Sequence, residues 1–335
     1  MEPPNISLIR AMYDYLDYLR VVKGVSKHTL RNYAVDCNSF LEYIGQHELQ
    51  QEEGETLASK ILWQESYDEQ RAKQDESFSL SLLDRQLCRR FLAFLHNEQK
   101  SKRTVVRRLS VLRSLCKYLL SCNLLKVSPL EGLESPKIGR PIPHALEYRE
   151  VERLFEQPDL SHYLGFRDRC IMELFYSSGL RVGELVALNR RDFDLQQLTL
   201  HLRGKGNRER LIPITKQAAG WLCDYLNHAE RQVKGPHHFP EEDQEAIFLN
   251  KWGRRLSVRS VDRSFKRYTS SSGLPRDVTP HTIRHTIATH LLEQGMDIKV
   301  IRDLLGHSSV QTTQIYTEVS PALKKQVYDQ THPRA

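Results

Sequence analysis

The sequence predicts a mostly α-helical protein with one small β-sheet, an α+β fold divided between two domains. Apolar residues recur at spacings of three and four along most of the chain, as on the buried faces of amphipathic helices. One alternating stretch with a glycine turn, close to Lys205, is typical of a β-hairpin. Four prolines lie between Val127 and Pro143, where the helical pattern stops, and 335 residues suffice for two domains.

The first domain is expected at residues 1–126 and is expected to be entirely helical. Gly24 is predicted to end its first helix, and Ser26 is predicted to cap the second. The four apolar stripes run over Ile9–Leu19, Leu30–Ile44, Leu83–Leu95 and Val105–Leu119.

Residues 46–77 interrupt these helices with a segment rich in glutamine and glutamate. It holds nine acidic and three basic side chains, a formal charge of −6. Because the whole chain carries +7, the rest carries +13. We interpret the segment as an insertion that is too polar to bury a face of its own, and the basic remainder as suited to an anionic partner such as nucleic acid.

Residues 127–143 are predicted to be a linker, and residues 144–335 a second domain that is mostly helical. Its hairpin is expected at Leu198–Leu202 and Leu211–Ile214, joined through Gly204-Lys205-Gly206-Asn207. Its helices are expected at Tyr163–Phe175, Val182–Leu188, Gln217–Val233, Val258–Ser270, His281–Gln294, Ile298–Leu305 and Gln311–Tyr316.

Several classes of protein are disfavoured by the sequence. It contains no nucleotide-binding phosphate loop and no Gly-x-Ser-x-Gly nucleophile elbow. His281 and His285 share a helical face, but no nearby carboxylate or cysteine completes a metal site, so we expect neither metal nor cofactor. His281 and Arg284 share a face equally well and suit a phosphate better. Six isolated cysteines, no long apolar span and no leader indicate a cytoplasmic protein with reduced thiols.

Four segments of the second domain occur in the order and with the spacing of a known family. They are SSGLRVGELVAL (177–188), LRGKGNRERLIPI (202–214), TPHTIRHTIATHLLEQG (279–295) and LLGHSSVQTTQIYT (304–317). The chain resembles the tyrosine recombinases through them and, more narrowly, the Xer recombinases that resolve chromosome dimers. VSKHTLRNYAVDCNSFLEYI (25–44) and RTVVRRLSVLRSLCKYLL (103–120) resemble the family's helical core-binding, SAM-like domain more loosely, so the second domain would be catalytic.

The resemblance implies a role for six residues. Tyr316 would be the nucleophile, Arg181 and Arg284 would bind the scissile phosphate, and Lys205 would be the general acid for the leaving 5′ oxygen. The two remaining residues, which would complete the phosphate pocket, are His281 and His307. Three features depart from the family's usual pattern without touching these positions: Ile283, Glu318 and the 46–77 insertion.

The chemistry explains these residue types. A tyrosyl phosphate preserves the energy of the phosphodiester, so the strand is rejoined without an energy source. Without a metal, preorganised cations must meet the charge of the transition state, and two arginines do so bidentately. Glu184, three residues after Arg181, is well placed to orient that guanidinium.

The implied function is site-specific recombination through a 3′-phosphotyrosyl intermediate, with chromosome dimer resolution at cell division. The alternatives are a phage, integron or transposon integrase, a tyrosine-dependent topoisomerase, and a DNA-binding protein without catalysis. The implied partners are a double-stranded DNA recombination site, a second Xer-type recombinase in a heterotetramer and a DNA translocase of the division septum. The C-terminal segment 320–335 is expected to dock into a neighbouring subunit.

Two groups of basic side chains are candidates for following DNA phosphates, although a solvated helix face explains each equally well. They are Arg107, Arg108, Arg113 and Lys117, and Arg254, Arg255, Arg259 and Arg263.

Overall fold

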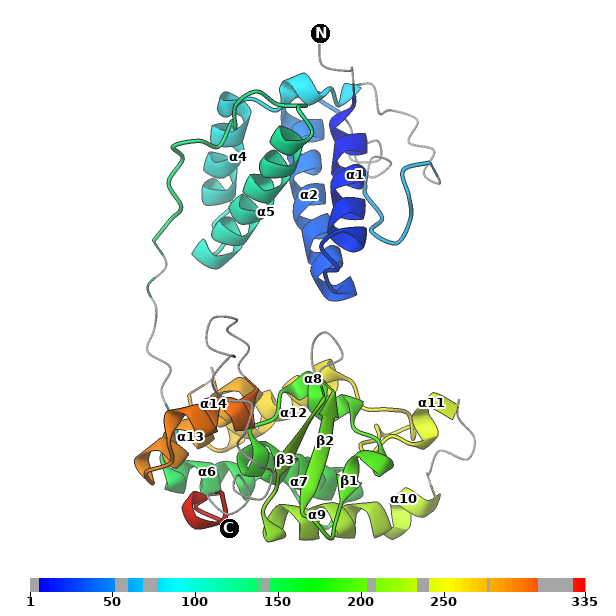
Figure 1. Ribbon diagram of the computed structural model, residues 1–335, viewed down its shortest axis with the longest axis vertical. Helices are drawn as coiled ribbons and strands as arrows, with labels where there is room; N and C mark the ends of the chain where they lie inside the picture. The colour runs from blue at the N-terminus through cyan, green and yellow to red at the C-terminus, as the bar shows by residue number, and fades with distance from the viewer. Residues whose placement is uncertain are drawn as a thin grey trace. The chain divides into compact units, whose positions relative to one another are not determined.

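The computed structural model describes residues 6–51, 60–68, 77–137, 139, 145–203, 209–233, 241–275, 278–306 and 328–334. The chain forms two compact units, residues 1–140 and 141–335 (Figure 1). Each unit has its own core of buried apolar side chains. Among the described residues, no helix combines the length and the apolar character needed to cross a bilayer.

The first unit is helical, as predicted. Helices α1, α2 and α5 pack against one another, and α4 packs against α5 (Figure 1). Each of these four helices begins after a residue whose side chain accepts a hydrogen bond from a backbone N–H of the first turn. These N-cap residues are Ser7, Ser26, Asp84 and Ser101. The elements are α1 (Leu8–Val21), α2 (Lys27–His47), the 3₁₀ turn η2 (Leu80–Leu82), α4 (Arg85–Asn97) and α5 (Lys102–Ser121).

Part of the acidic segment packs against the first two helices, which the sequence did not indicate. The Asn38 side-chain amide donates to the Ile61 carbonyl at 2.9 Å and accepts the Ile61 N–H at 2.7 Å. The Tyr13 hydroxyl accepts the Leu62 N–H at 3.0 Å. Ile61 is thereby fixed in the core with 2% exposure. Leu49, Trp63 and Tyr67 of the same segment are partly buried against this core. Their spacing has no regular period, so the pattern-based prediction of a segment without a buried face was wrong here.

The beginning of the predicted linker also packs on the first unit. Leu130 is buried in its core. Arg113 donates to the Leu133 carbonyl and to the Ser135 hydroxyl, the latter at 2.6 Å. The proline-rich stretch therefore starts as part of the helical unit.

The second unit surrounds helix α7 (Tyr163–Ser178), most of whose residues are buried. Helices α9 and α13 pack directly on α7, and a small sheet lies beside them (Figure 1). The other elements are α6 (Tyr148–Phe155), α8 (Val182–Ala187), η3 (Arg190–Asp192), β1 (Phe193–Asp194), β2 (Thr199–Arg203), β3 (Glu209–Pro213), α9 (Lys216–Asn227), α10 (Ala229–Val233), α11 (Glu241–Gln244), α12 (Val258–Ser271), α13 (Pro280–Glu293) and α14 (Ile298–Leu305).

The hairpin prediction is confirmed, with one more strand than expected. The sheet order is β1-β2-β3, all antiparallel, and Arg203 pairs with Glu209 at the end of the hairpin from which residues 204–208 connect the two strands. A two-residue strand such as β1 is too short to produce an alternating pattern, and this is why it was missed.

One helix prediction was wrong, and one helix was not predicted. The stretch Gln217–Val233 is two helices, because His228 has an extended backbone (ψ 132°) between α9 and α10. Its ring packs against the rings of Tyr163 and Phe166, so tertiary contact outweighs the helical periodicity. Helix α6 was not predicted, because it has only eight residues, too few for an apolar stripe to be recognised.

Candidate active site

Arg181 stands at the junction of two helices. Helix α7 ends at Gly179, whose left-handed backbone (φ 58°) turns the chain toward α8. A Cβ on Gly179 would lie 2.4 Å from a Leu305 methyl group, so this turn requires glycine for space as well as conformation. The Arg181 guanidinium donates to the Gly306 carbonyl at 2.8 Å and to Glu184 Oε1 at 3.0 Å. Its side chain is 38% exposed, so the group is positioned and still accessible.

Arg284 reaches the same turns from α13. Its guanidinium donates to the carbonyl oxygens of Gly179 and Leu305, and the residue is 6% exposed. Burial, together with the neighbouring charge of Arg181, lowers the pKa of Arg284 to about 10, although Glu184 opposes this shift. The side chain therefore remains a cation at neutral pH.

Glu184 binds two arginines at once. Its Oε1 accepts from Arg181 Nη1 and Arg210 Nη1, at 3.0 and 2.9 Å. Its Oε2 accepts from the Arg181 backbone N–H and Arg210 Nη2, at 2.8 and 3.0 Å. Burial would raise the pKa of Glu184, but the hydrogen bonds from Arg210 and the Arg181 amide outweigh it and hold that pKa below its usual value. The sequence-based expectation that Glu184 orients Arg181 agrees with this geometry.

The six predicted site residues are described to different extents. The structure brings Arg181 and Arg284 together at the turn formed by Leu305 and Gly306. His281 is exposed in the first turn of α13, three residues before Arg284. Lys205, His307 and Tyr316 lie outside the described residues.

Arg210 was missed by the sequence reasoning, although a signal was present. Along β3, Arg210 and Ile212 face inward while Leu211 is exposed. An arginine at an inward position of a strand needs an anionic or carbonyl partner, and Glu184 supplies it. Strand alternation would have singled out this position.

The C-terminal residues 328–334 dock on α7 of their own chain. The Tyr328 hydroxyl donates to the Ser177 carbonyl at 2.5 Å, and Arg334 Nη1 pairs with Glu173 Oε2 at 2.7 Å. His332 Nε2 lies 3.2 Å from the Tyr176 carbonyl, and burial lowers the pKa of His332 to about 4. The predicted exchange of this segment with a neighbour remains a prediction, and Leu323 and Val327 lie outside the described residues.

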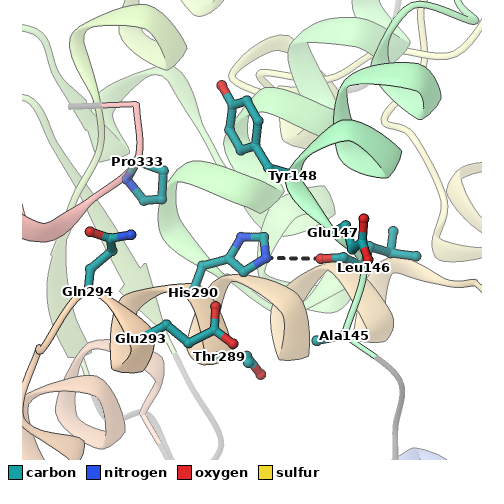
Figure 2. A pocket seen from close by; sticks show the side chains of 9 residues that line it. All are labelled: Ala145, Leu146, Glu147, Tyr148, Thr289, His290, Glu293, Gln294 and Pro333. Carbon is teal, nitrogen blue, oxygen red and sulfur yellow. Dashed lines mark hydrogen bonds between the residues drawn. The ribbon is translucent and has the colours of Figure 1, made fainter.

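A cavity of about 750 Å³ lies beside this tail and is lined by none of the six predicted site residues. Figure 2 shows Pro333 on one side of it and Glu147 on another, with His290 between them. His290 binds the Leu146 carbonyl at 2.9 Å and the Tyr176 hydroxyl at 2.8 Å, so its ring is part of the fold. In the described portion of the chain, no cluster of three or more potential metal ligands occurs.

Several of the basic candidates have internal partners. Arg107 pairs with the buried carboxylate of Asp36 at 2.5 Å, and Arg113 holds the start of the linker. Arg255 donates to the carbonyls of Val186 and Leu188 at the end of α8. Arg259 and Arg263 are exposed and one helical turn apart on α12. Of these residues, Arg259 and Arg263 remain the better candidates for phosphate contact.

Comparison with known proteins decides the family. Residues 144–322 match the group described as "Phage integrase family", and residues 12–74 and 68–123 match its "N-terminal SAM-like domain". The chain belongs to the phage integrase family, the tyrosine recombinases. This recombinase is therefore a DNA-cleaving and DNA-rejoining enzyme that acts at specific sites.

Relatives place the recombinase in the Xer type. "Tyrosine recombinase XerC" of Chlamydia caviae is 45% identical over 331 residues, spanning 98% of this chain and 100% of its own length. "Tyrosine recombinase XerC" of Syntrophus aciditrophicus is 36% identical over 321 residues, spanning 95% and 96%. The expectation of an Xer-type protein resembling XerC is confirmed.

Solved structures confirm the fold class. XerH site-specific recombinase bound to difH substrate gives a TM-score of 0.66 at 19% identity, over 96% of this chain and 92% of that one. A lambda integrase dimer bound to a COC′ core site gives 0.61 at 18% identity, over 97% and 78%.

Proposed function

We propose that Tyr316 is the nucleophile of this recombinase and that Arg181 and Arg284 bind the scissile phosphate. Lys205 protonates the leaving oxygen, and His281 and His307 complete the pocket. The anchoring of Arg181 and Arg284 on one pair of turns carries this proposal, because it holds two cations side by side with Arg181 still accessible. The polypeptide continues directly from those turns into His307.

The proposed step is a transesterification in which all bonds balance. The Tyr316 hydroxyl gives its proton to water or to a histidine of the pocket, and its oxygen bonds to phosphorus as the bond from phosphorus to the 5′ oxygen breaks. That 5′ oxygen takes a proton from Lys205. The product is a 3′-phosphotyrosyl bond and a 5′ hydroxyl. Attack by a 5′ hydroxyl of another strand reverses the step and restores a phosphodiester. Preorganised donors on the nonbridging oxygens are each worth a few kcal/mol, about 3, in such transition states.

A suicide duplex tests the nucleophile. Nicked near the cleavage point, the duplex loses the short fragment that carries the new 5′ hydroxyl. This traps the covalent complex, which a denaturing gel resolves. We expect Tyr316→Phe to bind the site as the unchanged protein does and to form no adduct, because only the attacking oxygen is removed. An adduct formed by Tyr316→Phe would assign cleavage to another nucleophile.

We propose further that this recombinase acts in the cytoplasm on a chromosomal DNA site together with a second Xer-type recombinase, and that it resolves chromosome dimers. The support is the relatives' name XerC, together with the XerH and lambda integrase structures, in which the recombinase is bound to a DNA site. Strand exchange between two labelled duplexes, with and without a second recombinase, tests the pairing. Exchange at full rate by this chain alone would favour the integrase alternative. A septal DNA translocase as a further partner rests on the sequence resemblance only.

A further inference from the structure

Arg210 connects the β-sheet to the arginine pair. It lies on β3 opposite Leu202, next to the Arg203–Glu209 pair that precedes the connecting residues 204–208. Its two terminal nitrogens donate to the two oxygens of Glu184, at 2.9 and 3.0 Å, in a side-by-side fork. With 19% side-chain exposure for Arg210 and 8% for Glu184, the pair is largely shielded from water. Such planar, two-point bonds fix orientation as well as distance.

Glu184 passes that orientation on to Arg181. Each Glu184 oxygen accepts one bond from Arg210 and one from Arg181, so rotating the carboxylate disturbs the bonds to both. Without Arg210, the carboxylate would keep its two bonds to Arg181 but would lose the other two bonds that fix its plane. Arg181 would then be anchored to a carboxylate that rotates more freely.

Arg210 also touches the turn that binds the arginine pair. A Cβ built on Gly306 would lie 2.8 Å from Arg210 Cζ and 2.9 Å from Nε, so the guanidinium lies directly against this glycine. The Gly306 carbonyl is the second acceptor of Arg181. Arg210 therefore contacts both groups that hold Arg181, namely Glu184 and Gly306.

We propose that Arg210 is a positioning residue for DNA cleavage: through Glu184 and Gly306 it holds the Arg181 guanidinium in the plane that receives the scissile phosphate, and it ties this plane to the hairpin that carries Lys205. The proposal rests on the phosphate-binding role proposed for Arg181. A displacement of about 1 Å in a reacting group lowers a rate about 10²-fold, so a residue outside the pocket has this leverage.

Arg210→Lys is the first test, because lysine keeps the charge and loses the fork. The measurements are the single-turnover rate of covalent complex formation on the suicide duplex at saturating protein, and the affinity for the intact site. We expect the rate to fall about 10- to 100-fold while the affinity changes less than about twofold. Arg210→Gln, with no charge and at most one bond, should lose more. An unchanged rate in both variants would overturn the proposal.

Arg167→Lys is the matched control. Arg167 is a buried arginine of the same unit, bonded to Asp168 Oδ1 through Nε at 2.9 Å and Nη2 at 2.6 Å, with no bond to Glu184. Its replacement removes a comparable buried fork. We expect a similar fall in melting temperature and a cleavage rate within about twofold of the unchanged protein, measured where all variants are folded. An equal loss of rate in Arg167→Lys would reduce Arg210 to a contributor to stability.

A double-mutant cycle separates positioning through Glu184 from an independent effect. If Arg210 acts through the carboxylate, Arg210→Lys should cost little once Glu184→Gln is present, and the double variant should cleave about as slowly as the slower single variant. If the double variant instead loses rate by the product of the two single-variant losses, the proposal is contradicted. Arg181→Lys is measured beside them. If it cleaves at full rate, the proposed role of Arg181 fails; if it is slow while Arg210→Lys is fast, only the positioning role fails.

Discussion

At the scale of single residues, charge balance explains why the arginines can be packed so closely. Arg181, Arg210 and Arg284 surround one carboxylate, Glu184, which leaves a surplus of two positive charges. The surplus appears in the lowered pKa of Arg284, which burial and the neighbouring cations produce together. A transition state formed from a phosphodiester anion and a phenolate carries about two negative charges. The arginines thus repel one another when the pocket is empty, and this repulsion is offset when negative charge develops in the transition state.

The proposed general-acid role of Lys205 is tested by changing the leaving atom of the DNA as well as the protein. An alkoxide leaves poorly without a proton, whereas a thiolate needs none near neutral pH. We therefore expect Lys205→Ala to be slow on the normal duplex, by about 10²- to 10⁴-fold, and to recover on a duplex with sulfur at the 5′ bridging position.

Arg284→Ala is the control for this experiment. This variant removes the positive charge that would stabilise the nonbridging oxygens, so sulfur at the bridging position should not restore its cleavage rate. If sulfur left Lys205→Ala slow, the general acid would have to be a histidine or water.

At the scale of elements, helix α7 contributes to both the proposed phosphate pocket and the binding of the C-terminal residues 328–334. Its C-terminal end turns at Gly179 into Arg181, and its side holds Tyr328, His332 and Arg334. The Arg334 guanidinium lies over the rings of Tyr148 and Tyr176, at 5.6 and 5.5 Å from their centroids. A change in how residues 328–334 contact α7 therefore acts on the helix that positions Arg181.

Docking of the C-terminal residues on α7 should weaken in mild acid, because the His332 imidazole is uncharged in the docked state. The pKa of His332 is lowered from 6.5 to about 4 in the folded chain, so between those values the undocked tail binds more protons. Docking is then strongest above about pH 6.5, weakens as the pH falls toward 4, and loses at most about 3 kcal/mol. An NMR titration of the His332 imidazole measures this pKa directly.

His332→Gln provides the comparison, since glutamine retains an N–H donor and does not titrate. The variant should keep the same unfolding free energy between pH 6.5 and 5, whereas the unchanged protein loses stability over that range. A His332 pKa of 6 or above would contradict the docked arrangement.

The sequence predicts the larger elements of this fold and misses the smallest ones. Long apolar stripes predict α1, α2, α5 and α7, and Ser26 is predicted as the cap of α2, because periodicity and caps act locally. The break at His228 and the seating of Ile61 depend on Tyr163 and Asn38, which are distant in sequence, so no local pattern contains them. For the site, motif order singles out Arg181 and Arg284, but only the folded chain shows that Arg210 meets Glu184 across 26 residues.

At the scale of the whole molecule, the tail raises the question of assembly. The contacts of residues 328–334 are made within one chain, through Tyr328, His332 and Arg334. The same surface of α7 can receive the identical segment of another copy, because exchange of an element between copies preserves its contacts. A head-to-tail exchange of this kind closes into a ring only when the rotation between copies is right.

Deletion of residues 320–335 tests whether the tail links copies on DNA. We expect single-site affinity to change less than about twofold, while cooperative binding of adjacent sites and strand exchange are lost, because a linking contact acts only between subunits. Gel shifts on one-site and two-site duplexes measure the first two, and labelled duplexes the third. Arg334→Ala should weaken cooperativity about 10-fold, since it breaks the buried pair with Glu173 and leaves Glu173 bound to Arg169. A truncated protein that recombines two sites at the full-length rate would show that the tail serves its own subunit alone.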